Sequence, residues 1–416
     1  MIRIGIIGCG RILAAHLRGY RLLKEAGYGD FKITALCSRK AEDAWGYVQR
    51  NGSYTQRPAV SRIPNDPLGI GNEFLSDFQE TDSVQVYTDY RELITVGCVD
   101  AVNDFTVHGL HHLVGMAALK NGKHLLTQKP LAVTIKAAAR LVEAAAEAGV
   151  TFGVFENARQ RLATRQWQWL LRSGLMGKPQ MALMGNVGTW WAPAQIVAET
   201  PWRHCLCEGG GISLDLGVHQ FDIIRSVMGE VDSVTARTDI VEPIRSTFDE
   251  TGKVLLDRIK CDADDTFYAS FAGRNSSGSG TLFGSWAGGG APTVLGNGPT
   301  FYGSKGRVSG DELHLSGEMG PESLSEKYFS SASPSTRERN QPFGLTNEFA
   351  IAQYDWLKAI QEGRQPEVDG NEGLIDLACA YAIVESAHSG RTVKVAEVLD
   401  GSVSAYQDAI NQHYNI

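Results

Sequence analysis

The sequence predicts an α/β domain built on a parallel sheet, followed by an α+β domain with a sheet rich in antiparallel strands. Three observations support this prediction. The chain has 416 residues, which is too many for one ordinary core, so two domains are expected. Up to residue 156, short apolar runs alternate with segments of helical periodicity, as in βαβ units. After residue 157, strand-like segments follow one another without helices between them.

The first domain begins with a buried strand at 2–8 and a helix in which Leu13, Leu17, Tyr20 and Leu23 recur at helical spacing. A second strand and helix follow at 31–39 and 40–52, and the same alternation resumes at residue 84. The further strands are expected at 84–89, 100–106, 123–129 and 150–156, with helices at 90–97, 111–122 and 134–149. We therefore place the first domain at residues 1–155.

Residues 51–83 interrupt this alternation, because they contain several prolines and glycines and little periodicity. We predict a long inserted loop, which in a compact domain is commonly functional. It leaves the sheet at the N-terminal ends of the strands, whereas ligands of open parallel sheets bind beyond the carboxyl ends. The insert is therefore expected to pack outside the first domain or against a neighbouring subunit, and not to act as a catalytic lid.

The second domain is expected to cover residues 156–416. It begins with a helix at 165–177, and strands are predicted at 179–188, 231–242, 265–273 and 279–288. Two long helices follow at 347–363 and 373–390. We expect these C-terminal helices either to stay with the second domain or to pack back on the first.

Composition excludes several classes of protein. The formal net charge is -8, whereas a nucleic-acid-binding protein needs a basic surface, so no nucleic-acid partner is expected. No run of about 18 apolar residues is present, so no membrane partner is expected either. The seven cysteines are scattered and odd in number, which indicates reduced thiols and a cytoplasmic location.

Gly8 and Gly10 stand between the first strand and the first helix. Glycines at this turn let backbone N–H groups approach a pyrophosphate at the helix N-terminus. The third glycine of the usual pattern is replaced by Leu13, but the flanking strand and helix still predict a Rossmann dinucleotide-binding domain. Arg11 and Ile12, which open the helix, are further candidates for cofactor contacts.

The end of the second strand faces the adenosine ribose in such domains. An acid there favours NAD, but this sequence has Ser38, Arg39 and Lys40. A hydroxyl and two cations suit a 2′-phosphate, so NADP(H) is the preferred cofactor and NAD(H) remains possible. The alternative is that both cations are simply solvated at a helix start.

The segment "GGGISLDLGVHQFD", residues 209–222, places Asp215 and His219 four residues apart, on one face of a helix. Such a pair can do acid–base work or bind a metal, or it can be a solvated face. The residues that could complete a metal site are His204, Cys205, Cys207, Glu208 and Asp222. Their spacing is not a recognised ligand pattern, so no metal is expected.

Four segments in order resemble the motif series of the glucose–fructose oxidoreductase, inositol dehydrogenase and rhizopine-catabolism family (Gfo/Idh/MocA). They are "GIIGCGRI", "VDAVNDFTVHGLHH", "GKHLLTQKPLA" and "GGGISLDLGVHQFD". The resemblance covers nearly the whole chain. It implies a Rossmann domain followed by an α+β domain with a large open, mostly antiparallel sheet, with the active site between them. It also implies an NAD(P)-dependent dehydrogenase or reductase of sugars, sugar derivatives or cyclitols, assembled as a homodimer or homotetramer.

Carried over by motif, the family's Glu-Lys-Pro corresponds to Gln128-Lys129-Pro130, which makes Lys129 the active-site lysine. Its Thr-Pro-Asn-x-x-His corresponds to the segment from Thr106 to His111. Thr106, His111, Gln128 and Lys129 are thus expected to contact the cofactor, with Gln128 in place of an acid. The resemblance also identifies Asp215 and His219 as the conserved pair of the second domain.

These residues suit hydride transfer from an alcohol. That reaction needs a base that takes the hydroxyl proton and a positive charge that stabilises the developing alkoxide oxygen. His219 titrates in a useful range and can be the base, and Lys129 can hold the oxygen. Asp215 can orient the imidazole or bind a substrate hydroxyl. Further candidates for substrate contacts are Asn157, Trp190, Trp191, Trp202 and Arg203, although the tryptophans could instead be core residues.

Two other functions stay open. One is a redox-assisted glycosidase of the same fold, which oxidises the sugar transiently and returns the hydride. The other is a non-catalytic sensor of a dinucleotide or sugar. The combination of Lys129, Asp215 and His219 favours an enzyme, because binding alone does not need these three residues.

Overall fold

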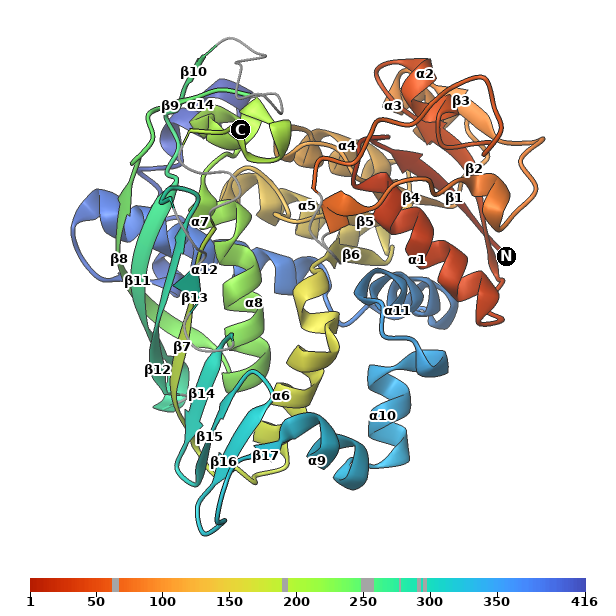
Figure 1. The fold of residues 1–416 in the computed structure, drawn as a ribbon. Coiled ribbons are helices and arrows are strands. Elements are labelled where there is room, and N and C mark those ends of the chain that lie inside the picture. The colour runs from red at the N-terminus through yellow and green to blue at the C-terminus, as the bar shows by residue number, and fades with distance from the viewer. Residues whose placement is uncertain (62–66, 189–193, 248–257, 277, 290–292, 295–297) are drawn as a thin grey trace. The chain divides into compact units, whose positions relative to one another are not determined.

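The structure is a computed structural model that describes all residues except 62–66, 189–193, 248–257, 277, 290–292 and 295–297 (Figure 1). The chain forms two compact units. Unit 1 comprises Met1–Asn157 and Phe343–Gly373, and unit 2 comprises Ala158–Pro342 and Leu374–Ile416. The chain therefore returns to unit 1 after most of unit 2, which a single boundary after residue 155 does not describe.

Unit 1 is built on a six-stranded sheet of order β3-β2-β1-β4-β5-β6, in which all neighbouring strands are parallel. This is the order of a Rossmann fold, as the sequence predicted. The strands are β1 (Ile2–Ile7), β2 (Phe31–Cys37), β3 (Gln85–Tyr87), β4 (Ala101–Asp104), β5 (His124–Gln128) and β6 (Phe152–Phe155). β4 and β6 are buried along their whole length, as expected for strands covered on both faces.

Helices surround this sheet. They are α1 (Leu13–Glu25), α2 (Ala41–Trp45), α3 (Tyr90–Thr95), α4 (His108–Lys120) and α5 (Ile135–Ala148). The apolar face of α1 is fully buried at Leu13, Leu17, Tyr20 and Leu23, as its spacing predicted. The second helix is shorter than expected: it ends before Gly46, after which the chain continues in turns.

A fifteen-residue helix from the C-terminal part of the chain, α11 (Glu348–Glu362), belongs to unit 1 and lies beside α1 (Figure 1). Trp356 on α11 is fully buried, and its indole N–H donates to the backbone oxygen of Leu125 in β5 at 3.0 Å. α11 thus completes the core of the Rossmann unit.

The insert at 51–83, as far as it is described, packs on unit 1. It contains two short 3-10 helices, Pro67–Gly69 and Leu75–Asp77. Leu75 is fully buried, and its N–H donates to the backbone oxygen of Tyr47 at 2.9 Å. Glu73 pairs with Arg21 of α1 at 3.0 Å, and the amide of Gln79 bonds to both backbone groups of Ile33.

Unit 2 contains a ten-stranded sheet of order β17-β16-β15-β14-β7-β12-β11-β8-β18, with β13 paired to β7. Only the β12–β7 pair is parallel among the pairings described, so the prediction of a large, mostly antiparallel sheet is confirmed. The strands are β7 (Pro179–Val187), β8 (Val231–Asp239), β11 (Thr266–Gly273), β12 (Ser279–Ser285), β13 (Thr293–Val294), β14 (Thr300–Gly303), β15 (Gly306–Ser309), β16 (Glu312–Leu315), β17 (Glu322–Ser323) and β18 (Val393–Lys394). A separate ribbon pairs β9 (Ile244–Arg245) with β10 (Ile259–Lys260).

The sheet of unit 2 is covered on one face, as β11 illustrates. Phe267 and Phe271 are buried there, whereas Tyr268 between them is 56% exposed. The helices of this part are α6 (Leu162–Arg172), α7 (Ile212–Asp215), α8 (Gly217–Met228), α9 (Leu324–Ser331), α10 (Pro334–Asn340), α12 (Gly370–Ser389), α13 (Val395–Leu399) and α14 (Asp408–Tyr414), and α12 begins in unit 1. Among the described residues, no helix combines the length and apolar composition that a membrane span requires.

Candidate functional site

The turn between β1 and α1 has the backbone of a dinucleotide-binding loop. Gly8 has a φ of +102°, and a Cβ atom there would lie 2.5 Å from the carbonyl of Phe105, so only glycine fits. At Gly10 a Cβ atom would meet nothing within 4 Å, so the loop borders open space. In the described part of the chain, no side chain caps the start of α1 at Ile12. This uncapped helix N-terminus, bordered by glycines, fits a pyrophosphate.

The end of β2 lies beside this loop, because the N–H of Gly8 donates to the backbone oxygen of Cys37 at 2.9 Å. Ser38 follows directly, and its N–H donates to the backbone oxygen of Tyr87 at 3.2 Å. Arg39 is exposed, as is Lys40, which begins α2. The loop thus has cations and a hydroxyl on the side of β2, while Arg11 and Ile12 are partly exposed on the side of α1.

A buried polar cluster connects the ends of β4 and β5. Asp104 is fully buried and accepts from the N–H and hydroxyl of Thr106, at 3.1 and 2.7 Å, and from the hydroxyl of Thr127 at 3.2 Å. Burial raises the pKa of Asp104, and the neighbouring His111 ring and these hydrogen bonds oppose that rise. The cluster fixes the turn that begins at Thr106.

The imidazole of His111 links the turn at Thr106 to the turn at Lys129-Pro130. Its Nδ1 lies 2.7 Å from the backbone oxygen of Pro130 and its Nε2 lies 3.2 Å from that of Thr106. Carbonyl oxygens only accept, so a hydrogen bond at either contact needs a proton on that ring nitrogen. His111 is 0% exposed. It therefore holds the Lys129-Pro130 turn through the backbone, and the cofactor contact that the motif implied stays a prediction.

The side chain of Gln128 contacts His16, a histidine for which no role was predicted from the sequence. The amide nitrogen of Gln128 lies 2.7 Å from Nε2 of His16 on α1, and Nδ1 of His16 lies 3.2 Å from the amide of Gln353 on α11. His16 is fully buried and stacks on Phe105 with ring centroids 3.5 Å apart. Burial lowers the pKa of His16 well below its usual value, so the ring is neutral.

Lys129 follows directly after Gln128 and is partly exposed. The Gln128 amide is engaged within unit 1, and the cofactor contact expected for Gln128 stays a prediction. Lys129 is thus preceded by a hydrogen-bonded, uncharged side chain and followed by the Pro130 carbonyl that His111 holds.

In unit 2 the predicted Asp215–His219 pair spans two helices. Asp215 ends α7, His219 lies in the first turn of α8, and Leu216 separates the helices with a φ of −101°. The three glycines before α7 allow close packing: a Cβ at Gly210 would lie 2.7 Å from the backbone oxygen of Arg203, and one at Gly211 would lie 2.3 Å from Oδ1 of Asp264. The glycine run therefore serves the packing of this loop.

Asp215 is held by an arginine. Nε of Arg203 donates to Oδ2 of Asp215 at 3.1 Å, and Nη1 donates to the hydroxyl of Thr200 at 2.5 Å. The guanidinium carbon lies 4.3 Å from the ring centroid of Trp202. Two of the predicted substrate residues thus lie together with Asp215 in unit 2, and His219 is partly exposed nearby in the chain. Trp190 and Trp191 lie outside the described residues.

Asp264 accepts hydrogen bonds from the first residues of α7. Local sequence patterns did not predict this role. Its Oδ2 accepts from the N–H of Ser213 at 3.0 Å and from the hydroxyl of Ser213 at 2.7 Å, while its backbone oxygen accepts from Ile212 at 2.9 Å. Asp264 is buried, and desolvation raises its pKa to about 6.

Several residues of the rival metal set have other partners. Asp222 is fully buried and pairs with Arg159 at 2.5 Å. Nε2 of His204 accepts from the N–H of Val197 at 3.1 Å, and burial lowers the pKa of His204 to about 4. Asn157, the remaining substrate candidate, is 8% exposed in unit 1.

The chain matches two family descriptions along its length. Residues 68–156 match "Oxidoreductase family, NAD-binding Rossmann fold", and residues 170–395 match "Oxidoreductase family, C-terminal alpha/beta domain". Together these matches cover most of the chain and both units.

Curated relatives and solved structures agree with these matches. The chain is 26% identical to myo-inositol 2-dehydrogenase of Thermotoga maritima, over 96% of this chain and 100% of the relative. It is 26% identical to 1,5-anhydro-D-fructose reductase of Ensifer adhaerens, over 74% of this chain and 83% of the relative. A structure of levoglucosan dehydrogenase in complex with NADH and L-sorbose shares the fold, with a TM-score of 0.73 and 19% identity over 95% of this chain and 99% of that one. The chain belongs to the Gfo/Idh/MocA family of oxidoreductases, and its first unit is an NAD-binding Rossmann domain.

Proposed function

We propose that this enzyme transfers a hydride between a nicotinamide dinucleotide and a carbinol or ketone of a sugar, sugar derivative or cyclitol. The observation that carries the proposal is the loop at Gly8 and Gly10, which borders open space at an uncapped helix N-terminus. The names of the relatives support the substrate class, since they include a cyclitol dehydrogenase and a sugar-derivative reductase.

When bound beside the glycine loop, a nicotinamide cofactor would supply the acceptor or donor of the hydride. His219 takes the proton of the substrate hydroxyl as general base and returns it in the reverse direction. The ammonium of Lys129 donates to the same oxygen and stabilises the negative charge that develops on it. The paired Arg203 and Asp215 bind neighbouring hydroxyl groups, and the Trp202 face contacts the apolar side of the ring.

His111 and Gln128 act as positioning residues for Lys129 and not through direct contact with the cofactor. His111 holds the Pro130 carbonyl, and Gln128 is tied to His16, so the backbone on both sides of Lys129 is fixed. A fixed backbone at the lysine matters because hydride transfer depends on close alignment of the reacting atoms.

We further propose that NADP(H) is preferred over NAD(H). Arg39 and Lys40 are exposed at the carboxyl end of β2, beside the glycine loop, and Ser38 adds a hydroxyl. No acid stands at positions 38–40 to accept from both ribose hydroxyls.

The proposal is tested by screening sugars and cyclitols with both cofactors and following the nicotinamide absorbance. The Lys129→Ala variant should lose turnover by about a hundredfold or more while it still binds the cofactor. Lys120→Ala, an exposed lysine on α4, is the matched control and should retain full activity.

Three outcomes contradict parts of this assignment. Full activity of Lys129→Ala would remove the lysine from the chemistry. Glycoside cleavage without net change in nicotinamide absorbance would indicate a redox-assisted glycosidase. Sugar binding without turnover of any substrate, in a correctly folded chain that binds cofactor, would indicate a sensor.

A further inference from the structure

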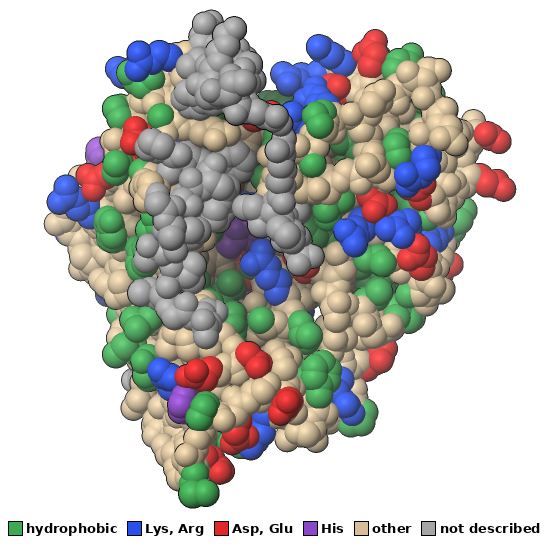
Figure 2. All heavy atoms as spheres, viewed as in Figure 1, with side chains coloured by type: hydrophobic (Ala, Val, Ile, Leu, Met, Phe, Trp, Pro, Cys, Tyr) green, Lys and Arg blue, Asp and Glu red, His purple; other side chains and the backbone are tan. Residues whose placement is uncertain are grey.

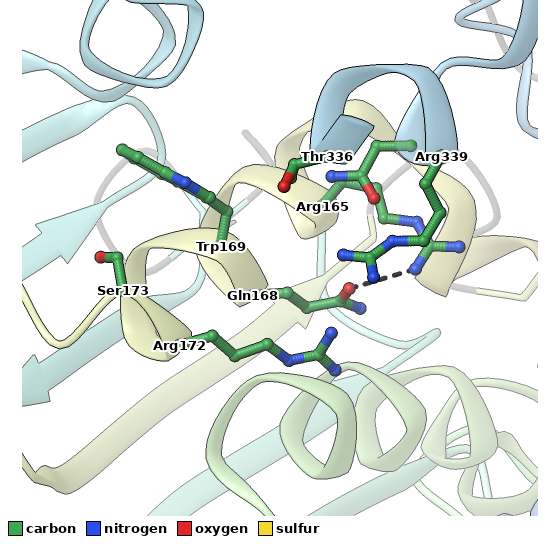
Figure 3. Close-up of a pocket in the computed structure, with 8 residues that line it drawn as sticks. Arg165, Gln168, Trp169, Arg172, Ser173, Thr336 and Arg339 are labelled. Atoms are coloured by element: carbon green, nitrogen blue, oxygen red, sulfur yellow. Dashed lines mark hydrogen bonds between the residues drawn. The ribbon is translucent and has the colours of Figure 1, made fainter. Parts of the chain in front are cut away.

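Unit 2 contains a cavity of about 200 Å³ between helices α6 and α10 (Figure 3). It is distinct from the residues proposed for catalysis, because neither Asp215 nor His219 lines it. The lining residues are Arg165, Gln168, Trp169, Arg172, Ser173, Thr336, Arg339 and Asn340.

The lining carries a strong positive charge. Three of the eight residues are arginines and none is acidic. Arg165 and Arg172 come from α6, and Arg339 comes from α10, so guanidinium groups reach the cavity from two elements (Figure 3). Clustered arginines with donors from several directions are typical of sites for phosphate and related anions.

Gln168 adds a buried donor that lacks an acceptor. The residue is only 2% exposed, and its Oε1 accepts from Nη1 of Arg165 at 3.2 Å. Its amide nitrogen has no hydrogen-bond partner in the part of the chain that the structure describes. A buried N–H without an acceptor is costly, so an acceptor is expected beside it when the cavity is filled.

Other polar groups of the lining are already used. The amide of Asn340 donates to the Tyr328 hydroxyl at 3.1 Å, and the Ser173 hydroxyl donates to the backbone oxygen of Leu170 at 2.7 Å. Trp169 packs edge-on against Tyr328 with ring centroids 5.4 Å apart, which gives one wall an apolar surface. The guanidinium of Arg165 is also engaged, since it donates to the side-chain oxygens of Gln168 and Gln160. The Gln168 amide nitrogen still needs an acceptor, and the arginines of the lining favour a negatively charged one.

We propose that this cavity binds a tetrahedral oxoanion, as inorganic phosphate or as the phosphate group of a small ester. A tetrahedral anion presents acceptor oxygens in several directions, which suits donors from α6 and α10 better than a planar carboxylate does. The volume exceeds that of a few water molecules, each of which occupies about 30 Å³ in the liquid, so a small substituent on the phosphate also fits.

The test is calorimetric titration of the full chain with inorganic phosphate, at constant ionic strength set with chloride and with saturating NADP present. NADP keeps the titrated phosphate out of the glycine loop and away from Arg39 and Lys40. Wild type should bind phosphate, and Arg339→Gln should bind it at least about tenfold more weakly. Arg337→Gln removes the same charge from the same helix without touching the lining, so it should stay within about twofold of wild type.

Glucose 6-phosphate and glucose distinguish the two sources of phosphate. Tighter binding of glucose 6-phosphate than of inorganic phosphate, with the gain lost in Arg339→Gln, would assign the cavity to an ester. Equal binding of both phosphates would assign it to the free ion, and glucose alone reports any binding at the proposed sugar site. The proposal is overturned if phosphate gives no saturable heat, or if Arg339→Gln and Arg337→Gln bind phosphate equally. Thermal melting of each variant confirms that it is folded.

Discussion

Replacing Asp264 by Asn should make unit 2 less sensitive to pH. Asp264 lies under the start of α7 and accepts two hydrogen bonds from Ser213. Asn keeps an oxygen acceptor and nearly the same shape, but it cannot ionise. The comparison of wild type with Asp264→Asn therefore isolates the free energy of charging this one buried carboxyl group.

The magnitude follows from the pKa of Asp264, which burial raises to about 6 from an ordinary value of 3.8. The folded chain binds this proton more tightly than the unfolded chain, so the stabilisation is fully present below pH 3.8 and is lost as the pH rises through 6. The difference corresponds to about 3 kcal/mol of unfolding free energy at 25 °C. Relative to Asp264→Asn, wild type should thus become less stable between pH 4 and pH 7 by an amount approaching this value.

The assay is urea unfolding of both proteins at pH 4, 5, 6 and 7, followed by fluorescence. Other carboxyl groups titrate in the same range, but they are shared by both proteins and cancel in the difference. Asp262→Asn is the matched control, because Asp262 is exposed in the same segment and accepts from the N–H of Leu206.

A flat difference between wild type and Asp264→Asn across this pH range would refute the reasoning. It would mean that Asp264 is ionised without cost, and therefore that the hydrogen bonds from Ser213 outweigh its burial. An equal pH dependence in the Asp262→Asn comparison would show that the effect does not belong to the buried site.

Three further predictions concern unit 1. Arg39→Asp should weaken NADP binding and favour NAD, as measured by kcat/KM with each cofactor; a wild type that already strongly prefers NAD would contradict the proposed role of Arg39. Gln128→Glu places a carboxylate beside His16 and should raise the pKa of that ring, as followed by NMR; an unchanged ring would show that the contact is not maintained. Replacing residues 54–80 with a short Gly/Ser linker should lower stability or change assembly but keep kcat within a few-fold, and a large loss of kcat with intact assembly would assign the insert to the active site.

The architecture of unit 1 could be predicted from the sequence because its signals are local. Apolar strands, the glycines after β1 and the spacing of Leu13, Leu17 and Leu23 each act within a few residues. The return of α11 to this unit was one of two alternatives that the sequence left open, because the choice depends on contacts such as that of Trp356 with Leu125, 231 residues apart. Helix α2 was predicted too long because its later part has a helix-like composition but continues beyond Gly46 in turns.

In the candidate site, too, short motifs could be predicted from the sequence, but contacts between distant residues could not. The Gly8 turn and the Asp215 and His219 segment follow from short motifs and their spacing. The partners that hold these motifs do not: Asp264 supports Ser213 across 51 residues, and Gln353 reaches His16 across 337. A lone buried Asp or Gln carries no periodicity, so only the folded structure brings such pairs together.

The two buried histidines of unit 1 show how a glutamine can precede Lys129, the proposed active-site lysine. The two ring nitrogens of His111 contact carbonyl oxygens, and the ring neighbours the buried Asp104. His16 is packed among Phe105, Phe155 and Phe349 and bonded to the amides of Gln128 and Gln353, which suits a neutral ring. A neutral imidazole offers one donor and one acceptor, and amides can match both. A carboxylate at position 128 would instead favour an imidazolium within this aromatic cluster, at a large cost in desolvation. The exchange of the family's acid for Gln128 is therefore consistent with the neutral His16, and it leaves the ammonium of Lys129 as the one charge of the Gln128-Lys129-Pro130 segment.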